Sequence, residues 1–373
     1  MNALRHLALG TFLLSALVQT ASAAEPAAKP ATENVVLLMT DGLRWQEVFG
    51  GAEEILMTKE NGGVTDVDAL KKDYWRDTPE ARREALMPFL WTVVAKQGQI
   101  YGNQAKGSVA EVTNGMKFSY PGYNETLCGF ADPRIDSNDK NLNPNVTVFE
   151  WLNRKPKFNG KTAAVTCWDV FPYIFNFERC GFPVNSANDP LVVSPTNPRI
   201  ELINRMKADT TNYFRGESWD SFVKESALEY IKQEKPRLFF LSLGETDSWC
   251  HAGRYDLYLR SAHAADAAFK NVWELLQSMP EYQGKTSVII VPDHGRGDAP
   301  VEWKNHGKKV PRSEYIWMAF LGPDTAPLGE RSNVPTVTQS QVAATLAALL
   351  GEDYAAAVPQ AAKPLAAVLK SAR

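Results

Sequence analysis

Five continuous runs of apolar residues constrain the fold of this 373-residue chain more than any other feature; they cover residues 34–40, 161–166, 237–243, 287–292 and 315–321. A strand that is apolar along its whole length is buried on both faces, which is typical of parallel strands covered by helices. Helical patterns separate the runs, at residues 81–95, 146–153, 219–233, 257–279 and 339–350. This alternation predicts an α/β fold with a mostly parallel central sheet flanked by helices.

Two polar stretches interrupt this alternation, at residues 47–77 and 169–199, and both are rich in Gly, Pro and Asn. We interpret them as loop insertions within a single domain at 34–373. They would either cover the functional site or be plain surface loops.

The N-terminus has the pattern of a secretory signal peptide at residues 1–23. Arg5 and His6 precede an apolar run, and Ala21-Ser22-Ala23 supplies the small residues of a cleavage site. An uncleaved membrane anchor is the alternative, but the apolar run is short for a bilayer. We therefore expect a mature tail at 24–33, a periplasmic or secreted protein, and no membrane span after signal removal.

Four cysteines are compatible with an oxidising compartment. Cys167 and Cys180 are close in sequence and flank a short loop, so we predict a disulfide between them, while Cys128 and Cys250 could pair elsewhere. No Cys-x-x-Cys spacing indicates a zinc–thiolate cluster. The formal net charge of -3 gives no indication of a nucleic-acid-binding surface.

Acidic and imidazole side chains follow three of the predicted strands. In an open α/β sheet, ligands bind beyond the carboxyl ends of the strands. Each residue alone could be a helix cap or a surface group, but six nitrogen and oxygen donors at such ends predict a dinuclear metal site. Donors of this kind suit Zn, Mn or Fe. The six are Asp41, Asp247, His251, Asp293, His294 and His306.

A hydroxyl group also stands at a predicted helix start, in the segment 118–125. Pro121 is acceptable in the first helical turn, which places Ser119 near free backbone N–H groups and the positive end of the helix dipole. Ser119 could be a simple N-cap, a phosphate-binding nucleophile, or both. Because no histidine is adjacent in sequence, metal coordination is the favoured way to lower the pKa of this serine.

Taken in order, these motifs resemble those of the alkaline phosphatase superfamily, above all type I phosphodiesterase/nucleotide pyrophosphatases and related phosphatases. The motifs are Asp41-Gly42, Ser119-x-Pro121, Asp247-x-x-x-His251, Asp293-His294-Gly295 and His306-Gly307. Gly129 follows Ser119 by ten residues, as in that family. Residues 336–346 resemble the family's closing helix, although its usual Asp is replaced. The resemblance extends over about residues 34–351.

The resemblance implies an alkaline-phosphatase-like catalytic domain that hydrolyses a small phosphate monoester or diester through a covalent phosphoserine at Ser119. It assigns Asp247, His251 and His306 to one divalent ion and the remaining three ligands to another. Zinc is the expected metal and manganese the alternative. The family often has an Asn that contacts a phosphate oxygen, and both Asn138 and Asn141 lie near that position.

Two other functions remain open at this stage. A sulfatase shares the fold but needs a Cys/Ser-x-Pro-x-Arg frame, and here Tyr123 stands where the Arg is required. A non-catalytic metal- or phosphate-binding module would have lost the nucleophile or several ligands, and none is lost. The substrate and the oligomeric state do not follow from the sequence.

Five basic residues are candidates for phosphate contact, although a solvated charge is the expectation for each: Arg44, Arg254, Arg296, Lys304 and Lys308.

Overall fold

The computed structural model describes residues 30–370. The predicted signal peptide and the first part of the predicted tail, residues 24–29, lie outside this range. Among the described residues, no helix combines the length and the apolar character needed to cross a membrane.

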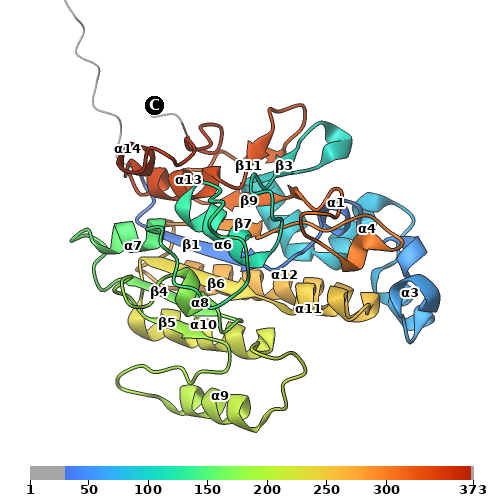
Figure 1. Cartoon of the computed structure of the whole chain (residues 1–373), viewed down its shortest axis with the longest axis horizontal. Coiled ribbons are helices and arrows are strands. Elements are labelled where there is room, and N and C mark those ends of the chain that lie inside the picture. The colour runs from blue at the N-terminus through green and yellow to red at the C-terminus, as the bar shows by residue number, and fades with distance from the viewer. Residues whose placement is uncertain (1–29, 371–373) are drawn as a thin grey trace, which may run out of the picture. The chain divides into compact units, whose positions relative to one another are not determined.

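The described residues form an eight-stranded central sheet with a mostly parallel core (Figure 1). The strand β9 is antiparallel to both of its neighbours, β7 and β2, and the other pairs are parallel. The predicted fold class is therefore confirmed. The strand order is β10 (Gly329–Glu330), β2 (Gln99–Tyr101), β9 (Met318–Leu321), β7 (Thr286–Pro292), β1 (Asn34–Thr40), β6 (Leu238–Leu243), β4 (Thr162–Thr166) and β5 (Val184–Ser186).

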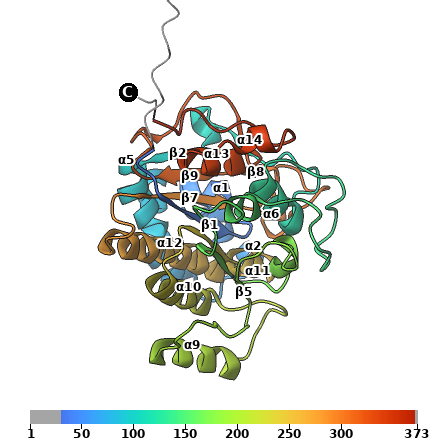
Figure 2. The same cartoon turned by 90° about the vertical axis from the view of Figure 1, so that its left-hand side faces the viewer.

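Helices cover both faces of this sheet, as its fully buried strands require. Figure 2 shows α6 (Ser119–Cys128) and α13 (Gln341–Leu349) on one face, with α10 (Asp220–Glu234) and α12 (Tyr255–Ser278) on the other. A second, three-stranded sheet within the described part of the chain consists of β11 (Val337–Thr338), β3 (Ala110–Glu111) and β8 (Tyr315–Ile316). Further helices of the described residues are α5 (Ala95–Gln97), η3 (Gln104–Lys106), α7 (Val148–Asn153), α9 (Pro198–Asp209), α11 (Glu245–His251), η4 (Glu302–Lys304) and α14 (Tyr354–Ala357).

Two predicted elements are divided in the structure. The helix predicted at 81–95 is interrupted after α4 (Pro79–Leu86) and resumes as the π-helical segment η2 (Leu90–Val94). At the interruption, the buried carboxylate of Asp266 accepts hydrogen bonds from the N–H groups of Phe89 (2.7 Å) and Leu90 (2.9 Å). The strand predicted at 315–321 is divided into β8 and β9 at Trp317, whose indole donates to the carbonyl of Leu43.

The two polar stretches contain more regular structure than the loops we predicted. Most of 47–77 is helical, in the end of α1 (Trp45–Gly50), η1 (Glu54–Leu56), α2 (Lys59–Gly62) and α3 (Val67–Tyr74). Thr58 and Asp66 cap α2 and α3 with their side chains. The stretch 169–199 contributes α8 (Phe171–Ile174) and the edge strand β5. Short capped helices lack the long apolar period that would have marked them in the sequence.

All four cysteines are free, so the predicted disulfide between Cys167 and Cys180 is wrong for this structure. Cys167 directly follows β4, and the register of β4 with β5 places residue 187 level with it. Cys180 precedes β5 and therefore lies toward the opposite end of the sheet. The thiol of Cys167 faces the Ser242 hydroxyl, and that of Cys180 faces the Phe182 carbonyl. The two thiols thus have different partners and are not bonded to each other.

Candidate metal centre

The three central strands β7, β1 and β6 bring the predicted ligands to one edge of the sheet. Thr40, the last residue of β1, is in register with Pro292 of β7 and Leu243 of β6. Asp41 and Asp293 therefore leave adjacent strands at the same level. Asp247 lies one helical turn beyond β6, in α11. Parallel neighbours thus convert three distant sequence positions into one cluster of side chains.

Asp41, Asp293 and His294 form the more deeply buried half of the cluster. The Nε2 atom of His294 lies 3.2 Å from Asp41 Oδ1 and 3.6 Å from Asp293 Oδ2. His294 Nδ1 donates to the carbonyl of Gly295 (2.9 Å), so the lone pair of Nε2 points at the two carboxylates.

These three converging atoms are all buried, and within residues 30–370 none of them has a hydrogen-bond partner. Buried polar atoms in proteins are almost always paired, and an exception calls for a physical reason. Two carboxylate oxygens and one imidazole nitrogen around a common point are suitable ligands for a divalent cation. The donor set therefore fits the metal that the motifs imply.

Proton binding in this half of the cluster is strongly perturbed. Burial and the neighbouring Asp41 carboxylate raise the pKa of Asp293 well above its ordinary range. Burial acts to lower the pKa of His294, but Asp293 and Asp41 outweigh it and raise this pKa to about 9. Carboxylates this close retain a proton unless another cation replaces it.

The second half of the cluster contains Asp247, His251 and His306. His306 Nε2 lies 3.6 Å from Asp247 Oδ1 and 2.9 Å from His251 Nε2, and His251 Nε2 lies 3.3 Å from Asp247 Oδ2. His306 Nδ1 donates to the carbonyl of Lys117 (3.2 Å), which leaves Nε2 free to accept. Burial holds the pKa of both histidines below the ordinary value, with help from the neighbouring His294. Neutral imidazoles are the form that binds metals.

All six predicted ligands are therefore brought together, with His294 between the two halves. His294 Nε2 is 3.7 Å from Asp247 Oδ1, and the rings of His294 and His306 stack with centroids 4.0 Å apart. Two triplets have ligand atoms within 4.8 Å of one another: Asp41 with Asp293 and His294, and Asp247 with His294 and His306. His251 lies beside the second triplet.

The first turn of α6 packs against this cluster. Gly122 lies so close to Asp293 that a Cβ atom on it would be 2.2 Å from the Asp293 carbonyl oxygen. One residue later, Tyr123 donates its hydroxyl to Asp41 Oδ2 (3.0 Å). Residues three and four positions after Ser119 share its face of the helix. Ser119 therefore shares the face of α6 that carries Gly122 and Tyr123, and just before the helix the carbonyl of Lys117 accepts from His306 Nδ1.

The two candidate asparagines differ in their environment. Asn138 Oδ1 accepts a hydrogen bond from the Tyr120 N–H (2.9 Å), so its side chain lies at the start of α6, beside Ser119. Asn141 contributes its backbone carbonyl, which accepts from the Tyr120 hydroxyl (2.6 Å), and its side chain is exposed. Of the two, Asn138 has the position from which a group bound at Ser119 could be reached.

Two of the basic residues predicted to be solvated are instead fully buried: Arg44 and Arg296. Arg44 pairs with Glu47 (2.8 Å) and Glu53 (2.7 Å). Arg296 pairs with the ligand Asp247. One feature of the sequence indicates this burial. Each arginine follows a ligand by two or three residues and so leaves the same edge of the sheet as that ligand.

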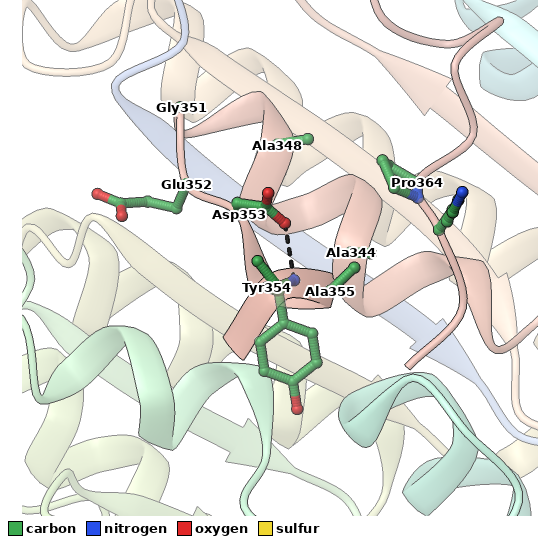
Figure 3. Close-up of a pocket in the computed structure, with 10 residues that line it drawn as sticks. Ala344, Ala348, Gly351, Glu352, Asp353, Tyr354, Ala355 and Pro364 are labelled. Atoms are coloured by element: carbon green, nitrogen blue, oxygen red, sulfur yellow. Dashed lines mark hydrogen bonds between the residues drawn. The ribbon is translucent and has the colours of Figure 1, made fainter. Parts of the chain in front are cut away.

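A cavity of about 650 Å³ lies elsewhere, between α13 and α14 (Figure 3). Its lining is rich in alanine, and none of the ligands contributes to it. The carboxylate of Asp353 in this lining caps α14 by accepting from Ala356 (2.9 Å). Tyr354 donates its hydroxyl to the carbonyls of Cys128 and Val146. These two polar side chains of the lining are thus used in holding the fold together.

No known family model matches the chain, and no curated protein matches it in sequence. Solved structures do match it. Alkaline phosphatase PafA aligns with 92% of this chain and 100% of its own length (TM-score 0.55, 10% identity). The sulfatase BT1596, described as a 2-O GAG sulfatase, aligns with 92% of this chain and 74% of its own (TM-score 0.51, 14% identity).

Murine ectonucleotide pyrophosphatase/phosphodiesterase 5, as an inactive variant in complex with AMP, aligns with 86% of this chain and 96% of its own (TM-score 0.50, 12% identity). These structural neighbours are members of the alkaline phosphatase superfamily, so the resemblance that the motifs indicated is confirmed at the level of the fold. The neighbours act on phosphate or sulfate esters, and the fold they share does not separate the two.

Proposed function

We propose that this chain, whose fold is that of the alkaline phosphatase superfamily, is a metal-dependent hydrolase of small phosphate esters with Ser119 as its nucleophile. The observation that carries the proposal is the convergence of three buried, unpaired atoms from Asp41, Asp293 and His294 beside the first turn of α6. A site with ligands alone would serve binding. The hydroxyl on the adjacent helix face is what makes it a candidate for catalysis.

The six ligands would hold two divalent ions, for which zinc is the first expectation. Asp41, Asp293 and His294 would hold one, and the second half of the cluster would hold the other. Such ions lower the pKa of a coordinated hydroxyl and neutralise the charge that develops on phosphate oxygens. The chain's own part is to keep three carboxylates and three imidazoles within a few ångströms of one another.

Ser119 would attack phosphorus in line with the leaving group. A bond forms between Oγ and phosphorus as Oγ loses its proton, while the ester P–O bond breaks and its electron pair leaves with the alcohol oxygen, which takes up a proton. Water then cleaves the resulting phosphoserine, which restores the hydroxyl and releases phosphate. The start of α6 favours the negative phosphoryl group through its N–H groups and dipole, and Asn138 lies beside it.

A sulfatase is the alternative, since one structural neighbour is a sulfatase. A sulfatase frame needs an arginine at residue 123, where a guanidinium would contribute positive charge. Tyr123 instead places a neutral hydroxyl against Asp41 (3.0 Å), and burial, with the neighbouring Asp293 and Asp41, raises its pKa well above the ordinary value. This contact supports the phosphate ester as substrate.

The test compares hydrolysis of nitrophenyl phosphate, bis-nitrophenyl phosphate and nitrophenyl sulfate by the same zinc-loaded protein. We expect phosphate turnover to exceed sulfate turnover, and Ser119→Ala to lower kcat by orders of magnitude. Thr126→Val is the matched control, because it removes another buried hydroxyl of α6, one that bonds only the Gly122 carbonyl (3.1 Å). The control should retain turnover and zinc.

Faster hydrolysis of the sulfate than of both phosphates would replace our proposal with the sulfatase. Zinc binding without turnover of any ester would indicate a binding module. If Ser119→Ala keeps wild-type turnover with both ions bound, or if trapped phosphate is found on another residue, then Ser119 is not the nucleophile.

We also propose that the protein is exported, from the signal-peptide pattern of residues 1–23. N-terminal sequencing of protein recovered from the periplasm or medium should begin after Ala23. A chain that keeps Met1 and stays in the membrane fraction would contradict this.

A further inference from the structure

Arg296 follows the ligand His294 by two residues, and its guanidinium lies against the ligand Asp247. The side chain is fully buried. Its Nη1 donates to the carbonyl of Lys304 (2.7 Å), and its Nη2 donates to the carbonyl of Asp247 (3.2 Å) and to the Oδ1 atom of the same residue. One side chain therefore contacts both the backbone and the carboxylate of a ligand.

These contacts join the segments that carry the second half of the ligand cluster. Asp247 lies on α11, after β6. Lys304 ends η4 and precedes the ligand His306 by two residues. Arg296 itself follows β7, so a single guanidinium connects the loop after β7 with the other two ligand-bearing segments. A planar guanidinium offers several donors in a fixed fork, which the single ammonium of lysine cannot reproduce.

Gly42 makes this approach possible. The residue has a positive φ of +56°, and a Cβ atom on it would lie 2.8 Å from Arg296 Nε, 2.9 Å from Asp247 Oδ1 and 3.0 Å from His294 Cε1. The turn after β1 thus leaves room for the guanidinium and the carboxylate to meet. Arg296 Nε has no hydrogen-bond partner among residues 30–370. The position of the side chain is therefore fixed by its two Nη atoms.

We propose that Arg296 is a positioning residue, which holds Asp247 and the segment of His306 in place so that the second divalent ion can bind. The inference rests on the two-ion centre proposed above. Arg296 donates no hydrogen bond to the carboxylates of the first triplet, which accept instead from Gly42 N, the Tyr123 hydroxyl and His294 N. Loss of Arg296 should therefore weaken one ion far more than the other.

Arg44 provides a matched control. It is the other fully buried arginine near this edge of the sheet, but its guanidinium pairs with Glu47 and Glu53 and contacts no ligand. Replacing either arginine removes a buried cation and should lower the melting temperature. Only replacement of Arg296 should change metal binding.

The experiment measures zinc bound per chain and zinc affinity, by competition with a chromogenic chelator, for the wild type, Arg296→Gln, Arg296→Lys and Arg44→Gln. Circular dichroism and gel filtration check the fold of each. We expect about two zinc ions in the wild type and in Arg44→Gln. Both Arg296 variants should keep one tight ion and bind the second about 10- to 100-fold more weakly, as is usual when a partner of a metal ligand is lost.

The result that overturns the inference is second-site affinity in both Arg296 variants within about threefold of wild type. Failure of both variants to fold while Arg44→Gln folds would also overturn it, because Arg296 would then hold the fold and not the ligands. A wild-type protein that binds no zinc would instead refute the proposed function.

Discussion

Glu125→Gln should destabilise the protein, because it places an amide among hydrogen-bond donors. The carboxylate of Glu125 is fully buried in α6. Its Oε1 accepts from Thr113 N (2.9 Å), Thr113 Oγ1 (2.8 Å), Ser340 N (3.1 Å) and Ser340 Oγ (2.6 Å). Its Oε2 accepts from Asn114 N and Asn114 Nδ2, both at 2.8 Å. This carboxylate joins α6 to the loop at 113–114 and to the start of α13.

The magnitude follows from which donors can adapt. Hydroxyl groups can rotate and accept from the new amide, but backbone N–H groups cannot. Whichever oxygen the amide nitrogen replaces, either Asn114 N or Ser340 N then loses its acceptor, which costs about 1–3 kcal/mol. The remaining bonds also lose the charge that made them strong. We expect a total loss of about 3 kcal/mol in the free energy of unfolding, which for a domain of this size is about 4 °C in melting temperature.

Differential scanning fluorimetry of the zinc-loaded protein measures this loss, with Glu281→Gln as the control. Glu281 pairs with Lys235 on the surface, so its replacement should leave the melting temperature nearly unchanged. Because α6 carries Ser119, Glu125→Gln should also lower kcat while two zinc ions remain bound. A melting temperature within about 2 °C of wild type would refute this account of Glu125 as the anchor of α6.

Three further predictions concern other contacts. Gly122→Ala should lower both stability and kcat, measured by thermal melting and ester turnover, because the new Cβ would meet the Asp293 carbonyl oxygen at 2.2 Å; an unchanged melting temperature would show that α6 can move freely. Burial raises the pKa of Asp266 from 3.8 to about 6, so the folded protein retains this proton more tightly than the unfolded chain does, and about 3 kcal/mol of stability should be lost as the pH rises from about 4 to 6. Asp266→Asn should flatten this pH dependence in urea titrations, and an unchanged slope would contradict it. Removal of zinc with a chelator should lower the melting temperature, since zinc at 100 times its Kd stabilises the fold by about 2.7 kcal/mol; a melting temperature indifferent to zinc would argue against the metal centre.

The sequence determined the class of fold and the membership of the ligand cluster. Residues 35–39 and 288–291 are apolar without interruption, and short runs of this kind are typical of strands buried on both faces. Since parallel strands end at one edge, a carboxylate placed directly after a strand, such as Asp41 or Asp293, has its location in the fold determined by local spacing alone. The same reasoning placed Ser119 at a helix start.

Tertiary structure decided everything that depends on pairing between distant segments. The order β7-β1-β6 places Asp41 between its partners, and no local pattern encodes that order. Burial of a charged residue is equally non-local: Arg296 is buried because Asp247 and Lys304 supply its acceptors, and those belong to other segments. The register of β4 with β5 likewise separates Cys167 from Cys180, although the two are close in sequence. Local propensity gives each element its type. Whether a charged side chain can be buried, or two thiols can meet, depends on neighbours that only the folded chain brings together.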